Sequence, residues 1–285
     1  MRRLTASLLC APSLVTLSSV VPPSQTASYS TARALRPPVT RADAPATAGP
    51  VQPLPIGDMQ ESPNWSGYGA SGGPFTAITG TFTVPGFSAG ARCTSELSEW
   101  VGIDGMNVPS SSPDPSLVQA GASEFATDTR TGICAARHPY IYFWWEIVPA
   151  PPTAIKAMRG HVGDKVTVTI ARAAAPRWLI SITDDSDKQH FATERPYQGV
   201  AATGEWIVEA PTSSVRCGAG LDPWVVVGLC PLLPFQPAIA FTALGLRGKA
   251  AELWPIAMVQ ESQQVATPSL PFADFFGVMY TGPDG

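Results

Sequence analysis

Residues 76–84 read Thr-Ala-Ile-Thr-Gly-Thr-Phe-Thr-Val. Ile78, Phe82 and Val84 share one set of alternating positions in this stretch, and threonines occupy positions between them. Such alternation is typical of a β-strand that has one face in the core and the other face in polar surroundings. The stretch therefore predicts a half-buried strand.

The same alternation recurs on the C-terminal side of this strand. It is clear in residues 165–170 (Lys-Val-Thr-Val-Thr-Ile) and again at Trp178, Ile180 and Ile182. Further strands are predicted at 96–104, 116–121, 139–148, 188–194, 203–209, 237–244, 254–260 and 275–281. Glycine, proline or aspartate clusters separate most of these segments, and no helical period is sustained. The sequence therefore predicts an all-β fold, either a β-sandwich of two stacked antiparallel sheets or a barrel.

The composition agrees with this fold class and excludes some functions. The chain has 285 residues, of which 14% are charged, and it contains 25 glycines and 30 prolines. Low charge with many turn-forming residues argues against a helical bundle. The formal net charge of −4 leaves no basic face of the kind that nucleic-acid-binding proteins use. We therefore expect no nucleic-acid partner.

Three regions are expected along the chain. Residues 1–27 begin with Met-Arg-Arg and continue with a short apolar run, which is typical of a secretory signal peptide. Residues 28–60 show no periodicity and are expected to be a disordered linker or a removable propeptide. Residues 61–285 would then form the sandwich domain. We expect a secreted, extracellular monomer that has no membrane contact after signal cleavage.

Four cysteines follow the expected signal peptide: Cys93, Cys134, Cys217 and Cys230. An even number in an exported chain indicates disulfides, although four cysteines allow three pairings. Cys217 with Cys230 would close one short loop and leave Cys93 for Cys134, and free thiols are the alternative. None of them stands in a Cys-x-x-Cys motif, so a zinc site is not indicated.

The short motifs of several enzyme classes are missing from the sequence. It contains no Gly-x-Ser-x-Gly, no His-Glu-x-x-His, no phosphate-binding glycine loop and no dinucleotide fingerprint. The three histidines, His138, His161 and His190, are expected at the surface rather than as metal ligands or catalytic bases. We therefore expect neither a metal nor a cofactor.

Carboxyl and amide side chains lie among aromatic residues in several predicted strands. Glu205 and Glu209 share one side of their strand, because side chains four positions apart point the same way. Acids crowded on one face raise the pKa of at least one of them, whereas a solvated outer face is the alternative. Gln119 and Glu146 occupy similar settings. Together these segments predict an aromatic-walled face with several carboxyls and one amide.

The order and spacing of these segments resemble those of the glutamic peptidases, also called eqolisins. The matching runs are 64–68 (Asn-Trp-Ser-Gly-Tyr), 80–85 (Gly-Thr-Phe-Thr-Val-Pro), 100–105 (Trp-Val-Gly-Ile-Asp-Gly), 117–121 (Leu-Val-Gln-Ala-Gly), 144–146 (Trp-Trp-Glu) and 205–209 (Glu-Trp-Ile-Val-Glu). The resemblance covers residues 64–282. It implies an antiparallel double-sheet sandwich like that of legume lectins, and secreted endopeptidases that act in acid, are made as zymogens and resist pepstatin-type inhibitors.

The resemblance also implies which residues act on a polypeptide substrate. The catalytic glutamine falls on Gln119 and the catalytic glutamate on Glu209, with Glu205 as the other candidate for the base. The positions expected to contact the substrate are Trp65, Gly67, Trp100, Asp104, Gly121, Trp144, Glu146 and Glu205.

Peptide hydrolysis needs a base for water, a donor for the oxyanion and an acid for the leaving nitrogen. Ionised Glu209 can take a proton from water and return it to the leaving amine, while the amide of Gln119 donates to the oxyanion. No metal or covalent intermediate is required. Crowded carboxyls lead us to expect a maximum at roughly pH 2–5. The alternatives are a secreted sandwich that binds or hydrolyses carbohydrate, and a non-catalytic binding module.

Overall fold

The computed structural model describes residues 54–87, 95–106, 116–126, 139–213 and 228–282, and every regular element in these ranges is a strand. The strands are β1 (Gln60–Ser62), β2 (Trp65–Gly72), β3 (Ala77–Thr83), β4 (Gly86–Phe87), β5 (Glu96–Ile103), β6 (Leu117–Phe125), β7 (Tyr140–Val148), β8 (Thr153–Ala154), β9 (Lys165–Arg172), β10 (Arg177–Asp184), β11 (Gln189–Pro196), β12 (Thr203–Glu209), β13 (Thr212–Ser213), β14 (Gly228–Leu229), β15 (Phe235–Gln236), β16 (Ile239–Arg247), β17 (Ala250–Gln260), β18 (Gln263–Pro268) and β19 (Phe276–Tyr280). Within the described ranges, no helix has the length and apolarity needed to span a membrane.

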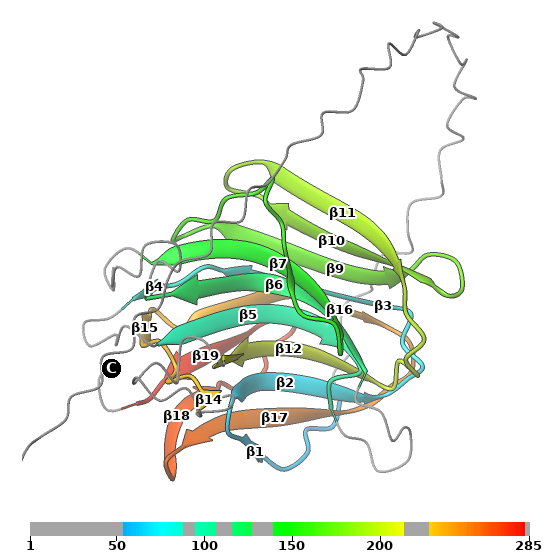
Figure 1. Cartoon of the computed structure of the whole chain (residues 1–285). Coiled ribbons are helices and arrows are strands. Elements are labelled where there is room, and N and C mark those ends of the chain that lie inside the picture. The colour runs from blue at the N-terminus through cyan, green and yellow to red at the C-terminus, as the bar shows by residue number, and fades with distance from the viewer. Residues whose placement is uncertain (1–53, 88–94, 107–115, 127–138, 214–227, 283–285) are drawn as a thin grey trace, which may run out of the picture. The chain divides into compact units, whose positions relative to one another are not determined.

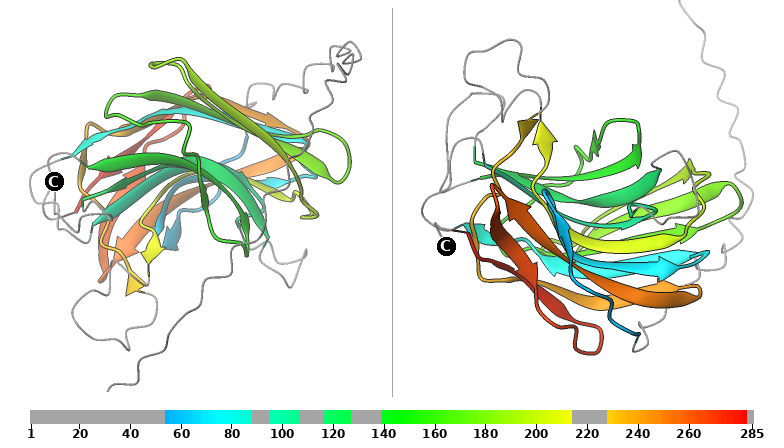
Figure 2. Two further views of the ribbon diagram at one scale, coloured as in Figure 1. Left: turned by 45° about the horizontal axis from the view of Figure 1, so that its top comes forward. Right: turned by 90° about the horizontal axis from the view of Figure 1, so that it is seen from below.

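One hydrogen-bonded ladder joins most of these strands and doubles back on itself (Figure 1, Figure 2). Its order is β11-β10-β9-β3-β16-β19-β18-β17-β2-β12-β5-β6-β7-β8, and β1 pairs with β17. Neighbours in this order are antiparallel, whereas β1 runs parallel to β17. Strand β9 packs across from β5 and β6, and β10 packs across from β6. The two arms of the ladder therefore form the two layers of a sandwich, and the predicted all-β sandwich is confirmed.

Alternating apolar residues fill the space between the layers. Ile78 and Phe82 of β3 are buried there, as are Val168 of β9 and Ile180 of β10. Removing apolar side chains from water is the main driving force for folding, so this layer of side chains stabilises the sandwich.

Each predicted strand has a counterpart in the structure, and the prediction for residues 203–209 matches β12 residue for residue. Strand β2 was not predicted as a strand, although it lies near the middle of the ladder. Its sequence, Trp-Ser-Gly-Tyr-Gly-Ala-Ser-Gly, contains no β-branched residue. Its position between β12 and β17 holds it in the strand conformation, since both neighbours pair with it.

Residues 54–62 lie against the body of the domain. Ile56 forms a parallel bridge with Leu253, and Gln60 is aligned with Ile256 at the start of β1. The backbone N–H of Gly57 donates to the carbonyl of Leu253 at 2.8 Å. The paired part of the chain thus begins before residue 61, the start expected from the sequence.

The expected disulfide cysteines are mostly outside the described residues. Cys93, Cys134 and Cys217 lie in ranges that the structure does not describe. Cys230 is fully buried and disulfide-bonded. The pairing of the four cysteines therefore stays a prediction.

A glycine of β3 allows the two layers to approach each other. A Cβ on Gly80 would lie 2.6 Å from Cδ1 of Trp206, a buried side chain of β12. We expect Gly80→Ala to lower the free energy of unfolding by about 1–3 kcal/mol, as overpacked cores do, in urea unfolding followed by tryptophan fluorescence.

The matched control is Gly277→Ala in β19, where an added Cβ would meet nothing closer than 3.9 Å. We expect this variant to be as stable as the wild type or more so, because alanine restricts the unfolded chain. Equal stability of the two variants would contradict the close packing at Gly80.

Candidate active site

The outer face of five adjacent strands carries most of the residues that the sequence singled out. Along β12, Trp206 and Val208 point into the sandwich core, so Glu205, Ile207 and Glu209 point to the other side. A second apolar cluster lies on that side. We call the outward side chains of β2, β12, β5, β6 and β7 the site face.

Strand register arranges the site face in rows that cross the five strands in the order β2, β12, β5, β6, β7. The first row consists of Trp65, Glu209, Ser98, Ser123 and Tyr142. The middle row consists of Gly67, Ile207, Trp100, Gly121 and Trp144. The third row consists of Gly69, Glu205, Gly102, Gln119 and Glu146. Trp100 thus lies in the middle row, between the rows of Glu209 and Gln119. Its strand, β5, also lies between β12 and β6, the strands that carry these two residues.

Two glycines of the middle row permit close backbone approach. A Cβ on Gly121 would collide with the backbone oxygen of Glu99, and a Cβ on Gly67 would collide with that of Trp206. Gly67 also has φ 147°, which L-residues with side chains rarely adopt. Both positions therefore require glycine for the backbone, whatever contact they make with a ligand.

Gln119 is held by a carboxyl on the adjacent strand. Its Nε2 donates to Oε2 of Glu146 at 2.5 Å. Its Oε1 is buried and has no hydrogen-bond partner among the described residues. Burial raises the pKa of Glu146, and the bond from Gln119 partly offsets this rise. The bond fixes the amide orientation and leaves the carbonyl oxygen available.

Glu209 is half-buried and receives two hydrogen bonds. Trp100 Nε1 donates to its Oε2 at 2.7 Å, and Asn64 Nδ2 donates to its Oε1 at 3.1 Å. Burial raises the pKa of Glu209 to about 7, the two bonds lower it, and the charge of Glu146 raises it. Glu209 is therefore within the electrostatic influence of the carboxyl that holds Gln119.

Glu205 has a different environment from Glu209. It is fully buried, and its Oε1 accepts the backbone N–H groups of Gly105 at 3.1 Å and Met106 at 3.2 Å. Burial raises its pKa to about 8. Glu205 is thus a buried member of the site face that holds a turn, whereas Glu209 is partly accessible.

Asp104 also fixes the backbone around the site. One carboxylate oxygen accepts Tyr197 Oη at 2.8 Å and the N–H of Ala201 at 2.7 Å, and the other accepts the N–H of Ala202 at 2.7 Å. Asp104 has φ 74°, a left-handed conformation that aspartate tolerates better than most residues. These contacts tie together two loops at one end of the face.

The structure therefore brings together most of the predicted positions. Those whose side chains belong to the site face are Trp65, Trp100, Gln119, Trp144, Glu146, Glu205 and Glu209. Sequence reasoning did not assign a role to Asn64, which binds Glu209 directly. The only sequence signal was its place next to Trp65 in a matching run, because the contact joins residues far apart in the chain.

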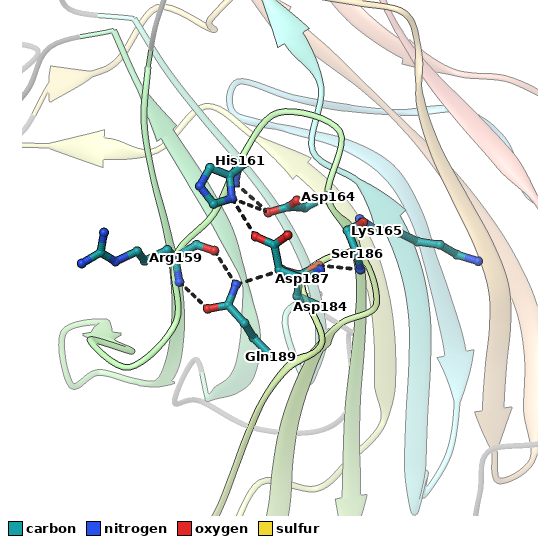
Figure 3. A network of polar contacts seen from close by, with 8 residues as sticks. All are labelled: Arg159, His161, Asp164, Lys165, Asp184, Ser186, Asp187 and Gln189. Atoms are coloured by element: carbon teal, nitrogen blue, oxygen red, sulfur yellow. Dashed lines mark hydrogen bonds and ion pairs between the residues drawn. The ribbon is translucent and has the colours of Figure 1, made fainter.

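The structure also places one histidine beside two acids at a different position (Figure 3). His161 Nδ1 lies 2.9 Å from Asp187 Oδ2 and 3.7 Å from Asp164 Oδ2, and the side chain of His161 is 62% exposed. Asp164 Oδ2 also accepts the backbone N–H of His161 at 2.6 Å. This group ties the turn before β9 to the turn after β10. His190 is also exposed, and His138 lies outside the described residues.

Comparisons with known proteins agree with this geometry. Residues 63–267 match the family model described as the Peptidase A4 family. The structure is similar to that of scytalido-glutamic peptidase with a transition state analogue inhibitor, with 17% identity, a TM-score of 0.61, and coverage of 77% of this chain and 99% of that chain. It is also similar to SCP-B, a member of the eqolisin family in complex with the tripeptide Ala-Ile-His, with 16% identity, a TM-score of 0.58 and the same coverage. No curated protein matches the sequence. The resemblance inferred from the sequence is confirmed, and the chain belongs to the Peptidase A4 family of glutamic peptidases.

Proposed function

We propose that this peptidase hydrolyses internal peptide bonds with Glu209 as the base that activates water and Gln119 as the oxyanion donor. The observation that carries this assignment is the position of Glu146. It bonds to the amide of Gln119 at 2.5 Å and acts electrostatically on Glu209. A carboxyl and an amide that both interact with one group on an accessible face can act on one scissile bond.

The same face has unpaired polar atoms that suit a peptide backbone. Trp144 Nε1 and Gln119 Oε1 are buried without a hydrogen-bond partner in the described part of the chain. A peptide supplies a carbonyl for the indole N–H and an N–H for the amide oxygen. Buried polar groups without partners are costly, so a side-chain movement that lets such a ligand pair with them would recover that cost. The family assignment favours polypeptide over carbohydrate as the substrate.

In the proposed reaction, ionised Glu209 removes a proton from a water molecule as the water attacks the peptide carbonyl carbon. The second N–H of the Gln119 amide donates to the carbonyl oxygen as it gains negative charge. Glu209, now protonated, gives the proton to the leaving nitrogen, and the C–N bond breaks. The products are a carboxylic acid and an amine, and Glu209 returns to its ionised state.

The raised pKa of Glu209 modifies the expected pH dependence. The sequence expectation of roughly pH 2–5 assumed that crowding lowers some pKa values, whereas burial raises the pKa of Glu146, Glu205 and Glu209 alike. The base must be ionised, and its ionised fraction falls about tenfold for each pH unit below its pKa. We therefore expect activity to rise with pH up to about 7, with a steep fall in stronger acid.

We also propose that the enzyme is secreted and matures by loss of its N-terminal region. The basic and apolar start of the sequence supports export. Residues 54–62 pair with β17, and a cut at residue 60 would remove part of this contact. We therefore place the cut before residue 54, so that the paired segment stays with the mature domain.

The first test concerns the two catalytic residues. Gln119→Ala should lower kcat by about 10²–10³, the usual cost of one oxyanion donor, and Glu209→Gln should abolish cleavage of a quenched fluorescent peptide. Glu205→Gln is the matched control, because its amide oxygen can still accept the two N–H groups. A folded, active Glu209→Gln variant together with an inactive Glu205→Gln variant would assign the role of base to Glu205.

The second test uses the charge beside the base. Glu146→Gln keeps a polar partner for Gln119 but removes the charge that raises the pKa of Glu209. The pKa of Glu209 should fall, so the acid limb of the kcat/KM profile should move to lower pH. Glu194→Gln, an exposed change on β11, should leave the limb in place. An acid limb that stays put or moves to higher pH in Glu146→Gln would argue against this coupling.

The third test should move the acid limb of the kcat/KM profile in the opposite direction. Asn64→Ala removes a donor that lowers the pKa of Glu209. The pKa should rise, and the acid limb should move to higher pH. Gln263→Ala, at an exposed position of β18, is the control. If the Asn64→Ala profile keeps its shape and only kcat falls, Asn64 does not act through the ionisation of Glu209.

A further inference from the structure

Two carboxyl groups lie in the sandwich core, on the opposite side of the sheet from the site face. Glu99 of β5 and Glu124 of β6 both have a relative exposure of 0%. They occupy the same alternating positions as Val101 and Ala122, which belong to the core cluster. Glu99 is aligned with Ala122, so Glu124 is its diagonal neighbour on the adjacent strand. Neither residue has a part in the proposed reaction.

Among the residues that the structure describes, the elements around this pair supply no cation to it. The inward residues of the neighbouring strands β12 and β7, including Trp206, Val208 and Phe143, are apolar. From the opposite layer, β3 and β9 contribute apolar inward residues, and β10 contributes Ile180, Ile182 and, at its end, Asp184.

The other charged groups on these elements already have partners. Asp184 accepts the N–H groups of Ser186 and Asp187 and the amide of Gln189, and Asp164 accepts the N–H of His161 (Figure 3). The cations of β9 and β10 are Lys165, which is exposed, Arg172, which stacks on Trp178, and Arg177, which pairs with Glu194 at 3.0 Å. Arg195 of β11 stacks on Trp145.

Glu99 and Glu124 are therefore each other's polar neighbours. Among the described residues, no donor from a third residue reaches any of their four carboxyl oxygens. Burial raises the pKa of Glu99 to about 8, and burial followed by the charge of Glu99 raises that of Glu124. Two ionised carboxylates in an apolar core would repel each other at low dielectric, so the folded protein must hold protons here.

We propose that the Glu99–Glu124 pair is a proton-binding site that confines the stable fold to acidic and near-neutral solution. Protonated, the two groups form a neutral pair in which each acid can donate to the other. Deprotonation places uncompensated charge in the core, and the sandwich opens to release it. This proposal goes beyond the catalytic mechanism, because neither carboxyl faces the substrate.

Ionisation of the Glu99–Glu124 pair would also disturb the site face. Glu99 directly precedes Trp100, whose indole N–H binds Glu209 at 2.7 Å. Its backbone also forms the surface against which Gly121 packs. Opening of the core at β5 and β6 would therefore separate the strands that carry Trp100 and Gln119, so activity would be lost together with the fold.

The sign of the effect follows from proton linkage. A carboxyl whose pKa is higher in the folded state contributes its full stability below its unfolded pKa, about 4.3. The contribution is lost as the pH rises towards the folded pKa, about 8 for Glu99. Between these limits the folding equilibrium constant falls about tenfold per pH unit for each such group, and so about a hundredfold for the pair.

The test is urea unfolding, followed by tryptophan fluorescence, at a series of pH values from about 5 to 7. The wild type, the double variant Glu99→Gln/Glu124→Gln and the exposed control Glu261→Gln are compared. Burial also raises the pKa values of Glu146, Asp164, Glu205 and Glu209, which contribute to the slope of all three proteins, so the informative quantity is the difference. For each pH unit, the folding equilibrium constant should fall about a hundredfold less steeply in the double variant than in the wild type. The control should match the wild type.

Equal pH dependence of the double variant and the wild type would overturn the proposal. If the double variant does not fold, Glu124→Gln alone should reduce the pH dependence by about one proton, which is about tenfold per pH unit in the folding equilibrium constant. A pH-stat count measures the same difference directly. Unfolding at about pH 6 should release about two more protons from the wild type than from the double variant, or about one more than from Glu124→Gln, and equal release would overturn the proposal. None of these measurements uses turnover, so failure of the proposed catalytic mechanism would leave them interpretable.

Discussion

The register between β5 and β12 is the constraint on which the site depends. Side chains alternate between the core and the site face, so a slip of one residue would turn Glu209 inwards and Trp206 outwards. The register also aligns Trp100 with Ile207 and so sets the indole N–H where it can reach the Glu209 carboxyl. Apolar packing behind the strands enforces this alignment, because a slipped strand would expose Trp206, which the core buries. The same alternation that forms the sandwich thus positions the chemistry.

Much of the fold could be predicted because alternation is a local property. The strand at 203–209 agrees with β12 at both ends, since apolar and polar residues alternate clearly there. Strand β2 shows the limit of such reasoning. It consists of small and aromatic residues, and its strand conformation comes from pairing with β12 and β17, which are distant in sequence. The start of the paired chain before residue 61 was missed for the same reason, because β17 supplies the partner groups.

The site was predictable in its residue types more than in their environments. Gln119 and Glu209 were singled out by motif, and the structure places both on one face. The contact of Asn64 with Glu209 joins positions 145 residues apart, and no local pattern signals it. Glu99 also escaped notice, because a glutamate in a strand usually marks the solvated side. Whether such a carboxyl lies inside or outside depends on which neighbouring positions are apolar, and here Glu99 lies in the core.

The doubled ladder also determines where this protein exposes unpaired backbone. Its two ends are β11 and β8, so within the described part of the chain these strands carry the edges that could pair with another molecule. Strand β8 has only two residues, and β11 ends at Pro196 after Glu194 and Arg195. Short length, charge and proline are features that discourage edge-to-edge pairing. Near its isoelectric point of about 5.4 the chain has little net charge to keep molecules apart, so these features of the edge strands matter most there.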